Sequence, residues 1–331
     1  MTSTAPPAQQ GRRLGIDFLR AACILYVVGY WHLIPYTTAL PGYANWLTEG
    51  FKYIALSTFV FCSGFLLARH RLSLDWQHLR SFYRRRLLRI YPLYLVTLIL
   101  FGVFGIASAR QVTHGALLIS MLSPPAMPTL WFITMIMAFY LIAPLLIRTS
   151  DRLALVLGIG GLLMAALVAQ HTWVKHIDLR ILLYLPVFVL GILYQARAEL
   201  GRLAERYRWP LLIALALMLP LSRIGNEWSV AGTLILMPLA LVSAATMMVF
   251  SEPVASRLHG PSIRLLAYAS FGLYLLHRLT FKAAIAAYFP ADGWSQVAYL
   301  LLLVLPATIL LAVGMQRAYD GLIENWGGKR H

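Results

Sequence analysis

The chain has 331 residues, of which 60% are hydrophobic and only 12% are charged, about half the charged fraction of an ordinary soluble domain. The apolar residues occur in long runs and the mean hydropathy is +0.71, which excludes a soluble enzyme, a disordered chain and a coiled coil. The formal charge is +16. In a chain of this composition the charge predicts topology rather than nucleic-acid binding, because basic loops stay on the cytoplasmic side of a membrane.

Runs of apolar residues predict the spans in chain order. A helix needs roughly 20 apolar residues to cross the hydrocarbon. The segment after residue 13 is too long for a signal peptide and is not followed by a cleavage site. Ten spans are predicted, near 14–36, 51–69, 90–109, 129–148, 153–169, 180–196, 210–223, 229–250, 264–288 and 295–317. The weaker run 112–122 precedes three prolines and predicts a re-entrant or interfacial helix.

The basic residues support this count. With the N-terminus in the cytoplasm, twenty Lys and Arg fall in inside segments and five in outside segments, as expected for an inner (plasma) membrane protein. We therefore predict an all-α membrane protein with both termini cytoplasmic. It consists of a mobile N-terminal tail (1–13), one transmembrane domain (14–317) and a cytoplasmic C-terminal tail (318–331).

The first span carries polar residues that hydrocarbon disfavours. Asp17 and Arg20 are three residues apart and share a helix face, so they form either a functional pair or an anchor at the cytoplasmic end. His32 lies ~18 Å further across the membrane. Its imidazole is suited to proton transfer, although a histidine that ends the outer helix is the alternative.

An arginine cluster precedes the third span. Arg84, Arg85, Arg86 and Arg89 lie within six residues, and guanidinium groups bind phosphate oxygens through paired hydrogen bonds. Phosphate recognition is favoured over a simple anchor on anionic lipid. The two cysteines, Cys23 and Cys62, predict neither a disulfide framework nor a metal site.

A late span carries a second polar group. Tyr274, His277 and Arg278 share one helix face, and Lys282 follows one turn later. A structural hydrogen bond between helices explains His277, but a substrate pathway is the alternative.

Taken together, these motifs resemble the acyltransferase 3 family of integral membrane acyltransferases, over about residues 14–317. The matching segments are Asp17 with Leu19-Arg20 and His32, Phe59 to Leu66 with Ser63-Gly64, Arg86 to Pro92, Leu130-Trp131-Phe132 with Tyr140 and Pro144, and Tyr274 to His277. The family normally has ten residues between the arginine and the histidine, whereas this chain has eleven. Either a local bulge accommodates the extra residue, or Arg20 and His32 do not share a face.

The resemblance implies transfer of an acyl group, usually acetyl, from cytoplasmic acyl-CoA to a hydroxyl of a carbohydrate. Acetyl-CoA is then a co-substrate, no cofactor or metal is bound permanently, and the partners are a polysaccharide or lipid-linked acceptor and membrane lipid, without nucleic acid. The implied catalytic residues are His32, Arg20 and Asp17, with His32 either the base or a transient acyl carrier. Residues implied to bind acyl-CoA are Arg86, Arg89 and Tyr91. Substrate contacts are expected, more weakly, from Ser63, Trp131, Tyr140, Tyr274, His277 and Arg278.

Two other classes of function stay open. In a transporter or flippase for an acidic or sugar-linked substrate, His277, Arg278 and Lys282 line the pathway, but the chain lacks the internal repeats typical of many transporters. The second open class is a scaffold protein that interacts with lipid. Cleavage of an acyl-CoA thioester by the purified protein distinguishes an enzyme from both.

Overall fold

The computed structural model describes residues 14–69 and 72–327. The predicted N-terminal tail, 1–13, and residues 328–331 lie outside the described residues. Within the described ranges helices are the only regular secondary structure, which confirms the predicted all-α class. The α-helices are α1 (Leu14–Tyr26), α2 (Trp46–Leu67), α3 (Trp76–Val103), α4 (Ala109–Ala116), α5 (Trp131–Arg148), α6 (Leu153–Ala169), α7 (Arg180–Ala196), α8 (Ala198–Arg206), α9 (Arg208–Met218), α10 (Val230–Ala255), α11 (Gly260–Ala287), α12 (Gly293–Ala298) and α13 (Leu305–Gly327).

Short π and 3-10 segments join or extend these helices. The π segments are η2 (Val27–Trp31), η4 (Gln170–Val174) and η6 (Tyr299–Val304), and the 3-10 segments are η3 (Ile34–Tyr36) and η5 (Leu219–Arg223). Several α-helices are therefore parts of longer, nearly continuous rods.

The described chain has seven helical segments that are long and apolar enough to cross a membrane. The bent pair of α7 and α8, with an angle of 102° between them, raises that number to eight. Helices α9 and α11 lie where spans were predicted, but α9 is short and the polar residues of α11 lower its hydropathy. The structure thus supports a multi-pass membrane protein, whereas ten spans and the side of the termini stay predictions.

Three predicted boundaries differ from the structure. Helix α3 begins at Trp76 rather than near 90, so the arginine cluster lies in the same helix as the third predicted span. Helix α13 continues to Gly327 without a break at 317. The weak run 112–122 contains only the end of the eight-residue α4, which is too short to span a membrane.

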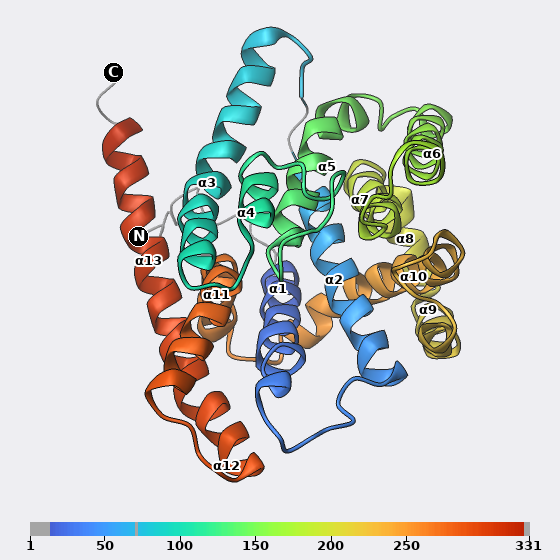
Figure 1. Cartoon of the computed structure of the whole chain (residues 1–331). Coiled ribbons are helices and arrows are strands. Elements are labelled where there is room, and N and C mark those ends of the chain that lie inside the picture. Colours follow the sequence, from blue (N-terminus) through green and yellow to red (C-terminus); the bar gives the residue numbers. More distant parts are fainter. Residues whose placement is uncertain (1–13, 70–71, 328–331) are drawn as a thin grey trace, which may run out of the picture.

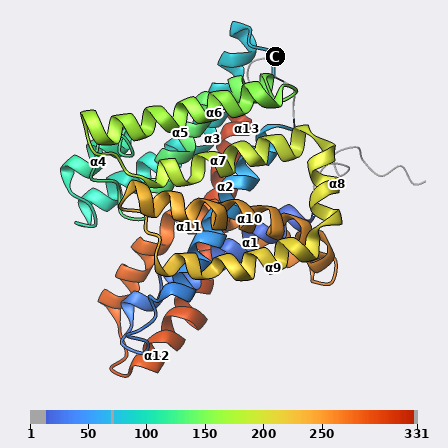
Figure 2. The same cartoon turned by 90° about the vertical axis from the view of Figure 1, so that its right-hand side faces the viewer.

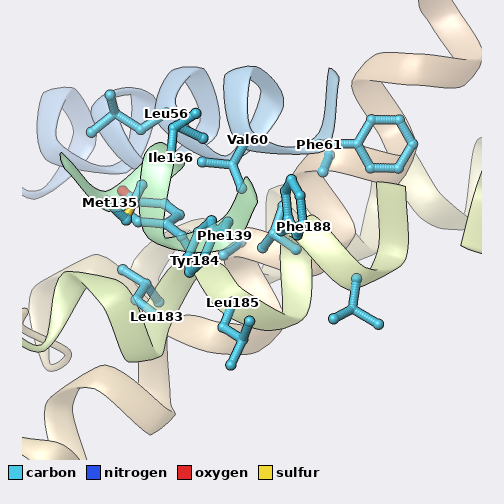
Figure 3. Packing of buried hydrophobic residues seen from close by; sticks show 14 of the residues in the cluster. Leu56, Val60, Phe61, Met135, Ile136, Phe139, Leu183, Tyr184, Leu185 and Phe188 are labelled. Carbon is cyan, nitrogen blue, oxygen red and sulfur yellow. The ribbon is translucent and has the colours of Figure 1, made fainter. Parts of the chain in front are cut away.

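Helix α1 lies at the centre of the molecule (Figure 1) and contacts α2, α10 and α11. On one side of it α6, α7, α10 and α9 run side by side, with α8 at one end (Figure 2). The largest core forms where α2, α5 and α7 meet, around Val60, Phe139 and Phe188 (Figure 3). This packing leaves the other face of α1 to α11, which carries Ser270, Tyr274 and His277.

Two glycines allow α2 and α7 to cross closely. A Cβ atom at Gly64 would collide with the carbonyl oxygen of Phe188, and one at Gly191 would collide with that of Phe61. The backbones therefore touch without intervening side chains, a packing mode common in membranes. This contact is the physical role of the glycine in the Ser63-Gly64 motif.

Exposed tryptophans mark the ends of several helices. Trp76 and Trp209 lie at the starts of α3 and α9, and Trp173 lies near the end of η4. Trp228 precedes α10, and Trp294 lies in the first turn of α12. Tryptophans in these positions are typical of the two interfaces of a membrane.

Candidate functional site

Helix α1 departs from α-helical geometry just before His32. The backbone N–H of His32 donates to the carbonyl oxygen of Val27, five residues earlier, at 2.9 Å. A π-turn of this kind accommodates one extra residue. The twelve-residue step from Arg20 to His32 therefore covers close to three whole turns, and of the two alternatives left by the sequence the structure shows the local bulge.

Arg20 and His32 both face α11. The Arg20 guanidinium donates through Nη2 to Ser270 Oγ at 2.9 Å. The His32 ring stacks on the ring of His277, with centroids 4.9 Å apart and ring planes 5° from parallel. Because both partners lie on one helix, the two side chains of α1 share a face.

The ring nitrogens of the two histidines differ in their surroundings. Nδ1 of His277 lies 2.8 Å from the carbonyl oxygen of Tyr274 and 3.3 Å from that of Leu273. Carbonyl oxygens only accept hydrogen bonds, so this nitrogen carries the hydrogen. Nε2 of His277 and Nδ1 of His32 are buried and have no hydrogen-bond partner. The His32 ring therefore reaches open space through its Nε2 edge.

A cavity of about 2100 Å³, here called the arginine cavity, lies among α1, α2, α3, α5, α11 and α13. It is larger than the roughly 300–1,000 Å³ of ordinary ligand pockets. Its wall includes Asp17 and Asp320 and seven arginines, which are Arg20, Arg69, Arg80, Arg84, Arg85, Arg86 and Arg89. Of the predicted substrate residues, Ser63, Tyr140 and Tyr274 also line it. The excess of positive charge suits an anion with several phosphates.

The arginines of α3 are available to such a ligand. Within 14–69 and 72–327 none of them forms an ion pair. Arg86 is half-buried, its guanidinium lies 5.7 Å from the centre of the Phe82 ring, and its Nε has no hydrogen-bond partner. A bound phosphate would supply the missing acceptor.

A second cavity of about 330 Å³, here called the aromatic cavity, contains His32 in its wall. Its aromatic residues are Trp31, Tyr53, Trp131, Trp228 and Tyr274, and its polar residues are Glu49, Lys52, Thr129, Arg180, Asn226 and Glu227. Most of its charges are paired. Lys52 Nζ lies 3.5 Å from Glu227 Oε2, and Arg180 forms an ion pair with Asp178.

The two cavities meet at a common wall. Val27, Leu56 and Tyr274 line both of them. The Tyr274 hydroxyl donates to the carbonyl oxygen of Thr129. The backbone φ of Thr129 is 59°, a value that is uncommon for residues other than glycine. His32 therefore lies one residue layer away from the arginine cavity.

Two predicted site residues lie elsewhere. The Tyr91 hydroxyl donates to the carbonyl oxygen of Ala116 at 2.8 Å, so this side chain faces α4 and lines neither cavity. Arg278 Nε donates to the Tyr36 hydroxyl at 3.4 Å, and it too lines neither cavity. His277 also lines neither cavity, and it reaches the site through its stacking on His32 and its contacts with Tyr274.

Several residues of the aromatic cavity were not predicted. Glu49 and Lys52 lie in the first turns of α2, and Asn226, Glu227 and Trp228 precede α10. Polar residues are common at the ends of spans. Only the acidic residues among these, in a chain with few acids, could have indicated a site from the sequence. No group of three or more His, Cys, Asp or Glu among the described residues is arranged to hold a metal ion.

At least seven spanning segments with charged and aromatic cavities inside the helix bundle define a multi-pass membrane protein with an internal polar site. The chain matches the family model described as an acyltransferase domain over residues 13–316 and belongs to the acyltransferase 3 family, as the motifs predicted. No curated protein and no solved structure matches it. The protein is thus a membrane acyltransferase.

Proposed function

We propose that the protein transfers an acyl group, most simply acetyl, from acyl-CoA in the arginine cavity to a carbohydrate hydroxyl in the aromatic cavity. The observation that carries this proposal is the common wall of Val27, Leu56 and Tyr274 between the two cavities, with His32 beside it. Two substrates can then approach one base from opposite sides.

The donor suits the arginine cavity. The unpaired guanidinium groups of Arg86 and Arg89 would bind the CoA phosphates, and Arg20 lies deeper along α1. From Arg20 to His32 the helix rises ~18 Å, a length that the extended pantetheine arm can cover. The thioester then reaches the common wall while the nucleotide stays among the arginines of α3.

The acceptor suits the aromatic cavity. Sugar rings pack their apolar faces on aromatic side chains, which Trp31 and Trp228 supply. The pairing of Lys52 with Glu227, and of Arg180 with Asp178, leaves little free charge for an ionic ligand. An uncharged hydroxyl-rich unit therefore fits best.

The reaction requires only proton transfer and acyl transfer. His32 Nε2 removes the proton from the acceptor hydroxyl, and the oxygen attacks the thioester carbonyl carbon. The carbon–sulfur bond breaks, the acyl group remains on the acceptor oxygen, and the CoA thiolate recovers the proton from His32. Atoms and charge balance without a further reactant.

A transport function has less support. Arg278 and Lys282, which would have to line a pathway through the membrane, contact neither cavity.

We also propose that the protein lies in the inner membrane with the arginine cavity facing the cytoplasm. Acyl-CoA is made in the cytoplasm, and the basic segments predict that side.

Substitution of His32 by Ala tests the proposal. We expect acetylation of the host cell's surface polysaccharide, and CoA thiol release by purified protein in nanodiscs, to fall at least about 100-fold. His259→Ala is the control, since the His259 side chain is exposed and hydrogen-bonds to Ser262, away from both cavities. Full activity of the His32 variant would contradict the catalytic role, and an absence of thioester cleavage by the unmodified protein would favour a transporter.

A further inference from the structure

Helix α11 presents two polar side chains to α1, at Ser270 and His277. We infer that α11 positions both reactive side chains of α1, with Ser270 fixing the guanidinium of Arg20 and His277 fixing the imidazole of His32. This inference rests on the proposed acyl transfer. Neither residue is assigned a catalytic role. His277 lines neither cavity, and the hydroxyl of Ser270, which lines the arginine cavity, is already bonded to Arg20 and to the carbonyl oxygen of Ala267.

Ser270 holds Arg20 through a hydroxyl group that cannot turn freely. Its Oγ donates to the carbonyl oxygen of Ala267 at 2.8 Å and accepts from Arg20 Nη2 at 2.9 Å. The residue is only 3% exposed, so water does not compete for either bond. The guanidinium is thereby kept against the wall of the arginine cavity.

His277 holds His32 through ring stacking. The residue is fully buried, and its Nδ1–H bond to the Tyr274 carbonyl fixes its own ring. The His32 ring lies parallel to it at 4.9 Å between centroids. Rotation of the His32 ring out of this plane would break the contact, so the stacking fixes the plane of the ring at the wall of the aromatic cavity.

The two contacts act on different steps. Arg20 and His32 follow each other along α1 in the same direction as Ser270 and His277 along α11, so the two helices are parallel. The Ser270 contact lies at the donor cavity and the His277 contact lies at the base. Loss of the first is expected to weaken acyl-CoA binding, and loss of the second is expected to slow the chemical step.

Steady-state kinetics of CoA release from acetyl-CoA, with the host surface polysaccharide as acceptor, separate the two roles. Ser270→Ala should raise the KM for acetyl-CoA roughly tenfold, because a hydrogen bond to a charged group is lost, and should change kcat little. His277→Ala should lower kcat at least about tenfold with an unchanged KM. His277→Phe, which keeps a planar ring for stacking, should recover most of that loss.

The control for Ser270 is Ser243→Ala. Ser243 is buried and its Oγ donates to the carbonyl oxygen of Ala240 at 2.9 Å, yet it lines neither cavity. Wild-type kinetics of both Ser270→Ala and His277→Ala beside an inactive His32→Ala would overturn the positioning role alone. Equal loss in His277→Phe and His277→Ala would overturn the stacking role, whereas an active His32→Ala would refute the proposed function itself.

Discussion

Arg86 and Arg89 lie one helical turn apart but are presented differently to the arginine cavity. Arg86 is half-buried with an unpartnered Nε, whereas Arg89 is exposed. A buried guanidinium with an unfilled hydrogen bond gains more from a phosphate than one that water already solvates. We therefore expect Arg86 to contribute more to acyl-CoA binding than Arg89.

Substitution of Arg86 by Lys tests this difference. Lysine keeps the charge but loses the planar fork that pairs with two phosphate oxygens, so the Kd for acetyl-CoA should rise roughly tenfold. Arg89→Lys should raise it less, and Arg152→Ala, an exposed arginine outside the cavity, should leave it unchanged. Binding of radiolabelled acetyl-CoA to purified protein measures all three. If Arg86→Lys bound acetyl-CoA as tightly as the unmodified protein, Arg86 would be only a membrane anchor.

At this scale the sequence predicts one cavity better than the other. Asp17, Arg20 and Arg86 were predicted because a charged residue within or beside an apolar run needs an explanation, and all three line the arginine cavity. Glu49 and Glu227 carry no such signal, since they lie at the ends of helices. Only the packing of α2 against the segment before α10 brings them together.

Among the helices, the crossing of α2 and α7 depends most on a single residue type. A methyl group at Gly64 meets backbone, which cannot move aside as a side chain can. Gly64→Ala should therefore lower the free energy of unfolding by about 1–3 kcal/mol, seen as a lower Tm in detergent. Gly161→Ala on α6 is the matched control, because nothing lies within 4 Å of a Cβ there. Equal Tm values for the two variants would show that the helices can separate without cost.

The elements also show where sequence periodicity reaches its limit. The arginine–histidine spacing predicted either a bulge or two different faces, and the choice between them depends on η2. Gly29, in this π-turn, would place a Cβ 3.2 Å from Leu305 Cδ2, so the turn also packs against the start of α13. Contacts between residues so distant in sequence have no counterpart in a hydropathy pattern.

For the whole molecule, the orientation in the membrane is the main prediction. Both native cysteines are buried, Cys23 at 4% and Cys62 at 2% exposure, so single added cysteines can be labelled with little background. In intact cells a membrane-impermeant maleimide should label Ala291→Cys, before α12, but not Ser256→Cys, after α10. Both positions are exposed, and both should react after permeabilisation. The reverse pattern would place the arginine cavity outside.

The number of spans illustrates the same limit at the largest scale. Hydropathy predicts that α11 is a span, but its Arg278 and Lys282 lower its mean hydropathy, and only seven or eight segments meet the requirements for crossing. Charged residues within a helix weaken the hydropathy signal by which a span is recognised, even where, as here, they line neither cavity. Helix α11, whose Tyr274 lines both cavities, is consequently among the least certain spans from sequence.

The wall of Val27, Leu56 and Tyr274 has an electrical consequence. Aqueous space on both sides of a thin partition concentrates the membrane potential across that partition, where each elementary charge moved costs about 2.3 kcal/mol per 100 mV. Moving the whole coenzyme with its phosphates across the wall would meet this cost several times over. An acyl group is uncharged, so it crosses the same voltage without doing electrical work.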